Sequence, residues 1–313
     1  MIFKANGKEY PLIEGLRDKL KPDWFEMMKP KKHQKLESCL FPCIPFVLRT
    51  EEELAKHNIS LVGKDILEAG CAYGERSYIM AKYEGTNVHG IDVDEYTADQ
   101  SPDMNSWNPK DMEIVHQKLD FARKELAGGF PESVTKKVTF ETCGMEKYAT
   151  PNPHDMIISW DVLEHIIDLP LAFNQMANSV KKGGIVYHKY NPFFAINGGH
   201  SLCTLDFFYG HCVLSSKDFE RYIREVRPFE EKMASCFYHK CLNRATRADI
   251  KELATKNGFE ILEYTGVERL GEIAREQGED LSGEVLETVK LHYPTVTVED
   301  LICDSVHIIL RKK

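Results

Sequence analysis

The chain of 313 residues carries 40 Lys and Arg against 49 Asp and Glu, a formal net charge of −9. Hydrophobic residues make up 42% of the chain and charged residues 28%. This balance is typical of a folded globular protein and excludes intrinsic disorder as the main state. The acidic balance argues against nucleic acid as a partner, because binding a phosphate backbone requires clustered positive charge.

The sequence predicts a cytoplasmic protein with no membrane partner. No run approaches the roughly 20 consecutive apolar residues that cross a bilayer, and residues 1–8 lack the apolar core of a signal peptide. The nine cysteines are scattered and form no C-x-x-C pair. Reduced thiols in a cytoplasm therefore fit better than a disulfide framework or a zinc site.

Residues 1–63 form an expected N-terminal accessory segment. Asn6-Gly7 is a strong hairpin-turn signal between two short strands. Thr50-Glu51-Glu52-Glu53 resembles a capping box and predicts a helix that begins there and runs to about His57. Pro42 and Pro45 are expected to break the apolar run before it.

From Lys64 the pattern alternates between strands and helices, which predicts an α/β fold with a doubly wound, mostly parallel seven-stranded sheet. The expected strands are Asp65–Ala69, Asn87–Asp92, Val138–Thr142, Met156–Trp160, Ile185–Tyr190, Phe259–Tyr264 and Ser305–Arg311. The expected helices are Glu75–Tyr83, Met112–Leu126, Pro170–Val180, Lys217–Glu225 and one capped by Thr246 and ended by Gly258. Residues 64–190 and 246–313 would form the core, and residues 191–245 a lid insertion after strand five.

A glycine-rich turn, Gly70-Cys71-Ala72-Tyr73-Gly74, joins the first core strand to its helix, where doubly wound folds bind nucleotides. A dinucleotide needs G-x-G-x-x-G with bare backbone against its pyrophosphate. Here Ala72 takes the second glycine position, and Glu68 and Glu75 flank the turn. Carboxylates would repel a pyrophosphate and suit a cationic ligand, such as an amino group and a sulfonium. A nicotinamide-dependent oxidoreductase remains the alternative.

Four motifs in order resemble those of class I S-adenosylmethionine-dependent methyltransferases. Residues 68–74 resemble the E/D-x-G-x-G-x-G motif, and Asp92 ends the next strand. Met145 follows the third strand, and Asp161-Val162-Leu163-Glu164-His165 resembles the D-V-L-E-H motif after the fourth. The resemblance covers about residues 64–190 and 246–313.

This resemblance implies S-adenosylmethionine as methyl donor and S-adenosylhomocysteine as product. Glu68, Gly70, Ala72 and Gly74 would hold the methionine part of the donor. Asp92 would bind the ribose and Met145 the adenine, while Trp160 and Asp161 would line the site. The alternatives from the residues alone are a plain turn, a helix N-cap at Asp92 and core packing for Trp160.

The acceptor would lie beyond the carboxyl ends of the strands. A hydroxyl or ammonium nucleophile must lose a proton, which suits histidine. His200 and His211, each in a Gly-His pair of the insertion, and His188 are the candidate catalytic residues, with turn residues as the alternative for the pairs. Tyr73, His165 and Tyr190 are candidate acceptor contacts.

Asn191-Pro192-Phe193-Phe194 resembles the motif of enzymes that methylate nucleobase amino groups. It follows the fifth strand instead of the fourth, so nucleic acid stays excluded as the favoured substrate. No metal is expected, because His188, His200, His211 and His239 show no tight ligand spacing.

The expected function is methyl transfer from S-adenosylmethionine to an oxygen, nitrogen or sulfur nucleophile of a small-molecule acceptor. Two alternatives stay open: the oxidoreductase, and a catalytically idle donor-binding partner subunit. Pairing into a homodimer through residues 1–63 also stays open.

Overall fold

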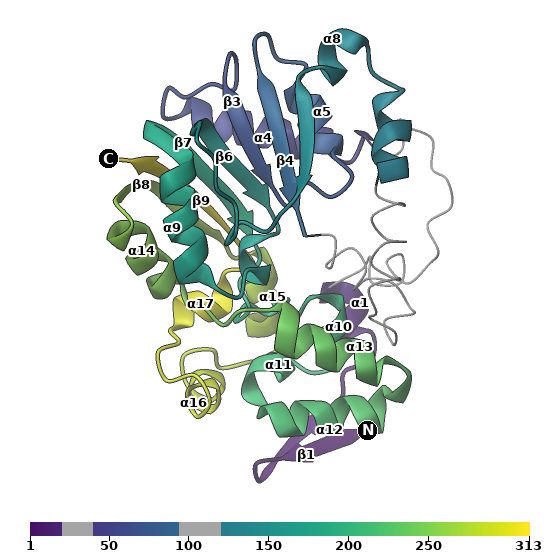
Figure 1. Cartoon of the computed structure of the whole chain (residues 1–313). Helices are drawn as coiled ribbons and strands as arrows, with labels where there is room; N and C mark the ends of the chain where they lie inside the picture. Colours follow the sequence, from purple (N-terminus) through teal and green to yellow (C-terminus); the bar gives the residue numbers. More distant parts are fainter. Residues whose placement is uncertain (21–39, 94–119) are drawn as a thin grey trace.

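A seven-stranded sheet forms the centre of the computed structural model, which describes residues 1–20, 40–93 and 120–313 (Figure 1). The strand order is β5-β4-β3-β6-β7-β9-β8, and only β9 runs antiparallel to its neighbours. The strands are β3 (Asp65–Ala69), β4 (Asn87–Asp92), β5 (Val138–Thr142), β6 (His154–Trp160), β7 (Val180–Tyr190), β8 (Phe259–Val267) and β9 (Ser305–Lys312). The predicted α/β class with a mostly parallel seven-stranded sheet is confirmed.

The sheet is covered on both faces, so its central strands are nearly continuous buried runs. On one face Leu67 and Ile157 pack in a core with α9 (Leu169–Ser179) and α14 (Arg247–Lys256). On the other face the second core includes residues of α4 (Ile44–Ala55) and α5 (Glu75–Met80). Because β3, β4 and β6 are parallel, their carboxyl ends lie at the same edge of the sheet.

The prediction that a helix begins at Thr50 is wrong, because α4 begins at Ile44. Pro45 stands in the first turn of α4, where its missing N–H breaks no hydrogen bond, so it starts the helix instead of breaking the run. Thr50 lies in mid-helix and is fully buried. Its hydroxyl donates to the Phe46 carbonyl (3.0 Å) and accepts the indole N–H of Trp160 (3.0 Å). This hydrogen bond fastens α4 to the sheet.

A second lobe lies beyond the carboxyl edge of the sheet (Figure 1). Its elements after β7 are α10 (His200–Cys203), α11 (Gly210–Val213), α12 (Ser216–Val226), η2 (Pro228–Glu230), α13 (Glu231–Cys236) and η3 (Phe237–Cys241). The predicted hairpin is confirmed as β1 (Ile2–Ala5) and β2 (Lys8–Pro11), and α1 (Leu16–Leu20) follows it. Tyr10 stacks on Phe207 with ring centroids 4.7 Å apart, so the hairpin packs on the insertion.

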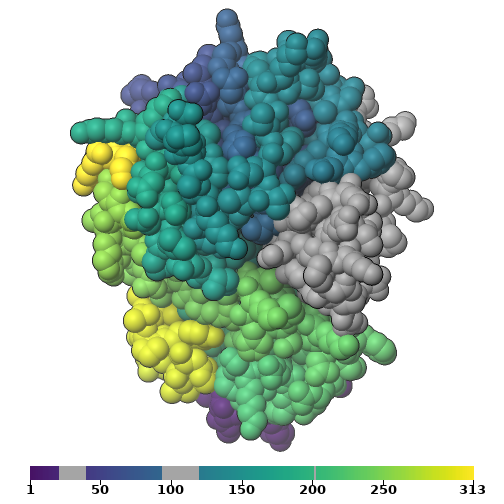
Figure 2. Space-filling view, viewed as in Figure 1, coloured from purple at the N-terminus to yellow at the C-terminus, as the bar shows by residue number. Residues whose placement is uncertain are grey.

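Segments far apart in the chain thus build this lobe together. In Figure 2 atoms from the N-terminus, the insertion and residues near 290 gather in the lower half of the molecule. The remaining described elements are α8 (Glu132–Thr135), η1 (Leu163–His165), α15 (Arg269–Glu276), α16 (Glu284–Lys290) and α17 (Val298–Ile302). Lys8 of the hairpin donates to Glu284 (3.0 Å) and Thr288 (2.7 Å) of α16.

The expected helix Met112–Leu126 lies partly outside the described residues, and residues 120–127 are helical. Within the described ranges, no helix is long and apolar enough to cross a membrane.

We expect Thr50→Val to destabilise the protein by about 1–3 kcal/mol, because the buried indole N–H of Trp160 would lose its acceptor. Urea unfolding followed by fluorescence measures the change. Thr50→Ser retains the hydroxyl and is the matched control. Equal stability of the two variants would show that this hydrogen bond does not fasten α4.

Candidate active site

The glycine-rich turn after β3 leaves no room for side chains at two of its positions. Gly70 has φ +73°, and a Cβ there would lie 2.1 Å from Val162 Cγ2. Gly74 has φ +89° and stands just before α5, where a Cβ would lie 2.3 Å from the Phe140 ring. Ala72 adopts φ +45°, a left-handed conformation that is costly for a residue with a Cβ. The turn is therefore a tightly packed strand–helix connection.

Two groups fix the turn at Ala72. Its N–H donates to Asp92 Oδ2 (2.6 Å), which places the Asp92 carboxylate beside the turn. Its carbonyl accepts from Arg123 Nη2 (2.7 Å) and Nε (3.1 Å), and the Arg123 guanidinium lies over the Phe140 ring. The sequence offered no signal for Arg123, since it lies in a helix without a motif.

Glu68 is fully buried on the α5 side of the sheet. It accepts a short hydrogen bond from the Ser77 hydroxyl, and its Oε1 lies 3.6 Å from Arg76 Nε. Burial raises the pKa of Glu68 to about 7, against the lowering effect of Arg76. Its carboxyl group is thus engaged with α5 and holds the helix that follows the turn.

The other expected donor contacts lie at the ends of β5 and β6. Met145 is buried in the core after β5. Asp161 adopts φ +56°, donates its N–H to the Lys189 carbonyl (2.7 Å) and pairs with Lys189 Nζ (2.8 Å). Trp160 is buried against α4 through Thr50. Tyr73 lies half-buried within the turn after β3.

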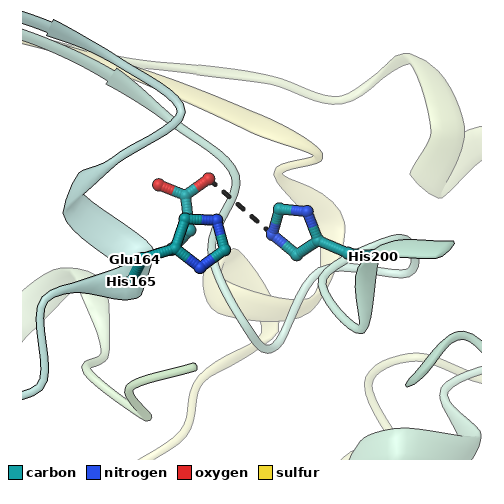
Figure 3. A group of neighbouring side chains, drawn as sticks. All are labelled: Glu164, His165 and His200. Atoms are coloured by element: carbon teal, nitrogen blue, oxygen red, sulfur yellow. Dashed lines mark ion pairs between the residues drawn. The ribbon is translucent and has the colours of Figure 1, made fainter. Parts of the chain in front are cut away.

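Three side chains of metal-binding and acid–base type converge beyond β6: Glu164, His165 and His200 (Figure 3). Their ligand atoms all lie within 4.8 Å of one another. Glu164 Oε1 lies 3.8 Å from His200 Nε2, and the two imidazole rings have centroids 4.8 Å apart. Glu164 was not among the predicted site residues, although the D-V-L-E-H motif contained the signal, an acid directly before a histidine.

The Glu164 carboxyl group is buried, with its side chain 1% exposed. Oε1 accepts the Asn191 N–H (3.0 Å), while Asn243 Nδ2 donates to the Leu163 carbonyl (2.8 Å) and the Ile166 carbonyl (2.9 Å). Burial raises the pKa of Glu164 to about 8, and the nearby Asp161 charge adds to this effect. The turn after β6 is therefore held by residues at both the start and the end of the insertion.

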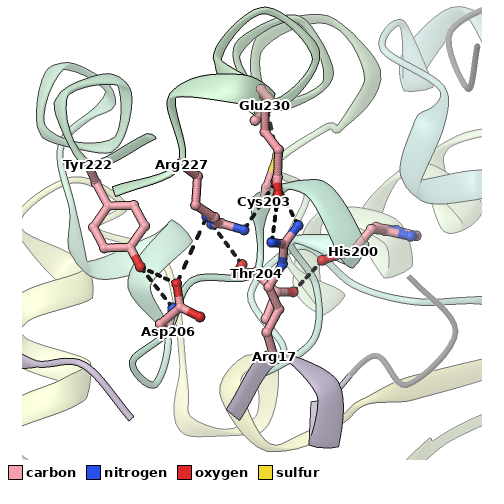
Figure 4. Close-up of polar contacts among 9 residues, drawn as sticks. Arg17, His200, Cys203, Thr204, Asp206, Tyr222, Arg227 and Glu230 are labelled. Atoms are coloured by element: carbon pink, nitrogen blue, oxygen red, sulfur yellow. Dashed lines mark hydrogen bonds and ion pairs between the residues drawn. The ribbon is translucent and has the colours of Figure 1, made fainter. Parts of the chain in front are cut away.

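His200 reaches this cluster from the insertion in a left-handed conformation, φ +51°. A Cβ on Gly198 would lie 2.2 Å from the Phe193 carbonyl oxygen, and one on Gly199 would lie 2.5 Å from the Cys203 backbone. The two glycines thus let the chain fold tightly before His200. The Thr204 hydroxyl donates a short hydrogen bond to the His200 carbonyl (Figure 4).

The structure places three other predicted residues in the protein interior. His188 is buried, with Nδ1 2.6 Å from the Ser159 hydroxyl, and burial lowers its pKa to about 3. His211 lies in α11, with Nε2 2.8 Å from the Phe193 carbonyl oxygen. The Tyr190 hydroxyl lies 2.8 Å from that of Tyr264. Of the predicted acceptor-side residues, only His165 and His200 are brought together.

Comparisons of the sequence and of the fold with known proteins give the family of the chain. Residues 45–264, more than half of the chain, match the family model described as "Methyltransferase domain". A curated relative, the ubiquinone biosynthesis O-methyltransferase of Stutzerimonas stutzeri, is 28% identical over 173 residues, which are 53% of this chain and 61% of the relative. The match thus spans less than two thirds of that relative.

The chain is also similar to solved structures, two of which are the following. Magnesium protoporphyrin IX methyltransferase from Synechocystis PCC 6803, with bound S-adenosylhomocysteine, is 14% identical with a TM-score of 0.47, covering 93% of this chain and 94% of that one. Phosphoethanolamine N-methyltransferase 2 from Haemonchus contortus, in complex with S-adenosyl-L-methionine, is 19% identical with a TM-score of 0.47, covering 84% and 52%.

The chain belongs to the methyltransferase-domain family. Its motifs resemble those of class I S-adenosylmethionine-dependent methyltransferases, and its sheet has the α/β topology that this resemblance predicts.

The buried imidazole of His211 makes stability depend on pH. Burial lowers its pKa to about 4, whereas an unfolded histidine has a pKa of about 6.5. Between these values the unfolded chain binds a proton that the folded chain does not, so this contribution is full above pH 6.5 and is lost as the pH falls toward 4. The loss reaches about 3 kcal/mol at pH 4.

We therefore expect His211→Gln, which can still donate to the Phe193 carbonyl, to lose less stability between pH 7 and pH 4 than the natural protein. Urea unfolding at a series of pH values measures the difference. His239→Gln, at a partly exposed histidine, is the control. If the free energy of unfolding fell equally with pH in the natural protein and in His211→Gln, His211 would not be the source of the pH dependence.

Proposed function

We propose that this chain transfers the methyl group of S-adenosylmethionine to a nucleophilic oxygen, nitrogen or sulfur atom of a small-molecule acceptor. The single observation that carries the proposal is the contact between the turn after β3 and the turn after β6. Val162 fills the space beside Gly70, and Glu164 and His165 follow it directly. A donor held by the first turn would thus lie next to titratable groups that face an acceptor.

The proposed donor site uses the residues that the family motifs mark. At Gly70, Ala72 and Gly74 the backbone of the turn would contact the methionine part of the donor. Asp92 would accept hydrogen bonds from the ribose hydroxyls, and Met145 would contact the adenine. Glu68 would be a positioning residue: through its hydrogen bond with Ser77 it would hold α5, and with it the turn, in place. Trp160 is not part of the proposed donor site, because its indole N–H donates to Thr50.

Methyl transfer is an in-line displacement in which the neutral thioether of S-adenosylhomocysteine leaves, so the protein mainly has to align the nucleophile. A hydroxyl or ammonium acceptor must also lose a proton. In the proposal His200 and His165 lie on the acceptor side and take part in that step, with Asp161 and Tyr73 at its border. His188, His211 and Tyr190 are left out, since each is hydrogen-bonded within the protein interior.

We further propose a reducing, cytoplasmic location, because the buried Cys71, Cys203, Cys212 and Cys303 are thiols outside any disulfide. A homodimer stays a prediction. Residues 1–20 pack on the insertion of their own chain, so a homodimer through this segment would have to use its outer surface.

We expect Asp92→Ala to weaken donor binding by about 1–3 kcal/mol, the scale of hydrogen bonds to a charged group, or roughly 5- to 150-fold in Kd. Calorimetry with S-adenosylhomocysteine measures it. Asp155→Ala is the matched control, because Asp155 lies near the opposite end of the sheet, paired with Lys181. An unchanged Kd in Asp92→Ala would refute the ribose role.

The acceptor can be identified by incubating the protein with isotopically labelled S-adenosylmethionine and a metabolite extract, followed by mass spectrometry. We expect the natural protein to produce a labelled small molecule. The same product should be absent with Asp92→Ala when the donor concentration is below the raised Kd of this variant. Donor binding without any labelled product would instead support the idle donor-binding subunit. Binding of NADH in place of the donor would support the oxidoreductase.

A further inference from the structure

The cluster of Glu164, His165 and His200 has the composition of a metal site, and its three side chains come from two separate parts of the chain. Glu164 and His165 lie in the short helix η1 after β6, whereas His200 begins α10 in the insertion. Their ligand atoms lie within 4.8 Å of one another. Around an ion bound at roughly 2.1 Å such atoms lie about 3–3.5 Å apart, so small side-chain rotations would complete the site.

The tautomer of His165 is fixed in the form that binds metal ions. Its Nδ1 lies 2.7 Å from the Cys241 carbonyl oxygen. A carbonyl oxygen only accepts, so Nδ1 must carry the proton, and in a neutral imidazole Nε2 then carries the lone pair. A backbone carbonyl that orients the ring of a ligating histidine in this way is a common feature of metal sites.

Glu164 supplies an independent sign of a missing ligand. Its Oε1 accepts the Asn191 N–H, but its Oε2 is buried and has no hydrogen-bond partner among the described residues. A buried oxygen of a carboxyl group without a hydrogen-bond partner is costly, because burial removes it from water. A cation beside it, between the two histidines, would remove that cost.

The backbone at His200 also points to a function. His200 adopts φ +51°, and three of the six non-glycine residues with positive φ in the described ranges lie at this edge of the sheet: Ala72, Asp161 and His200. Strained backbone persists where the surrounding structure imposes it, and it gathers at functional sites. Here the strain brings the His200 ring to Glu164.

We propose that Glu164, His165 and His200 bind one divalent transition-metal ion of the first row, such as Co²⁺, Mn²⁺ or Zn²⁺. Two imidazoles and one carboxylate favour these ions over Mg²⁺ and Ca²⁺, which prefer oxygen ligands alone. Three protein ligands leave coordination positions open, as in catalytic sites. The inference rests on the proposed methyltransferase function and deepens it, because the open positions face the acceptor side.

The metal site selects a class of acceptor, namely a molecule with a hydroxyl group that binds the ion. Coordination lowers the pKa of that hydroxyl, and its proton leaves to solvent. The resulting oxygen lone pair attacks the donor methyl carbon while the carbon–sulfur bond breaks, and its electron pair stays on sulfur. The products are a methyl ether and S-adenosylhomocysteine. Thioether acceptors, which need no deprotonation, are then disfavoured.

Cobalt binding tests the site without any acceptor. The full chain is treated with a chelator, freed of it, loaded with Co²⁺ and dialysed, and the bound metal is measured by mass spectrometry together with the visible absorption of Co²⁺. We expect one Co²⁺ per chain with nitrogen ligation. Glu164→Gln and His200→Ala should each weaken binding at least tenfold. His239→Ala should bind as the natural protein does, because its His–Glu pair, 2.9 Å from Glu220, lies on the surface.

Two outcomes overturn the proposal: no stoichiometric Co²⁺ in the natural protein, or equal binding by Glu164→Gln and His200→Ala. Thermal unfolding tests whether each variant is folded. If Glu164→Gln or His200→Ala is not folded, His165→Ala replaces it in the binding measurement. Calorimetry with S-adenosylhomocysteine on the same samples separates the two hypotheses. Donor binding without metal binding would defeat only the metal site, whereas absence of donor binding in the natural protein would defeat the proposed function.

Discussion

The candidate site depends on one close approach, that of the Gly70 backbone to the side chain of Val162. No residue with a Cβ fits at Gly70, where the gap to Val162 Cγ2 would be 2.1 Å. This contact joins the turn after β3, which carries the proposed donor motif, to the turn after β6, which carries Glu164 and His165. Because parallel strands end at the same edge, the absence of a side chain at Gly70 lets the proposed donor motif lie beside Glu164 and His165.

The sheet could be predicted because its signals are local and periodic. Each core strand is a short apolar run bounded by polar or glycine residues, and the observed strands contain every predicted one to within a residue. The error at α4 has the opposite cause. Thr50-Glu53 carries the local signature of a helix start, but tertiary packing decides the outcome. The helix begins earlier, at Ile44, because Thr50 is buried against Trp160 and because Pro45 suits the first turn of a helix.

The placement of the candidate-site residues could be predicted only where these residues are contiguous in the sequence. The donor motif and Asp92 follow from strand ends, which the pattern locates well. His200 and His211 have the same Gly-His context in the sequence, yet one ring meets Glu164 and the other donates to the Phe193 carbonyl. Nothing local distinguishes them, because the insertion has no period and its path is set by packing. Arg123 was missed for the same reason: its partner is a backbone carbonyl 51 residues away.

The N-terminal segment is tied to the second lobe by buried polar contacts. Arg17 of α1 forms a paired contact with Glu230 (3.0 and 2.8 Å), and both side chains are nearly buried (Figure 4). Arg227 lies beside Glu230 and donates to the Thr204 carbonyl (3.0 Å), while Thr204 holds the His200 carbonyl. Buried ion pairs add little net stability, since desolvation offsets their attraction. The network therefore connects α1 through Glu230, Arg227 and Thr204 to the backbone of His200, the residue that reaches the cluster.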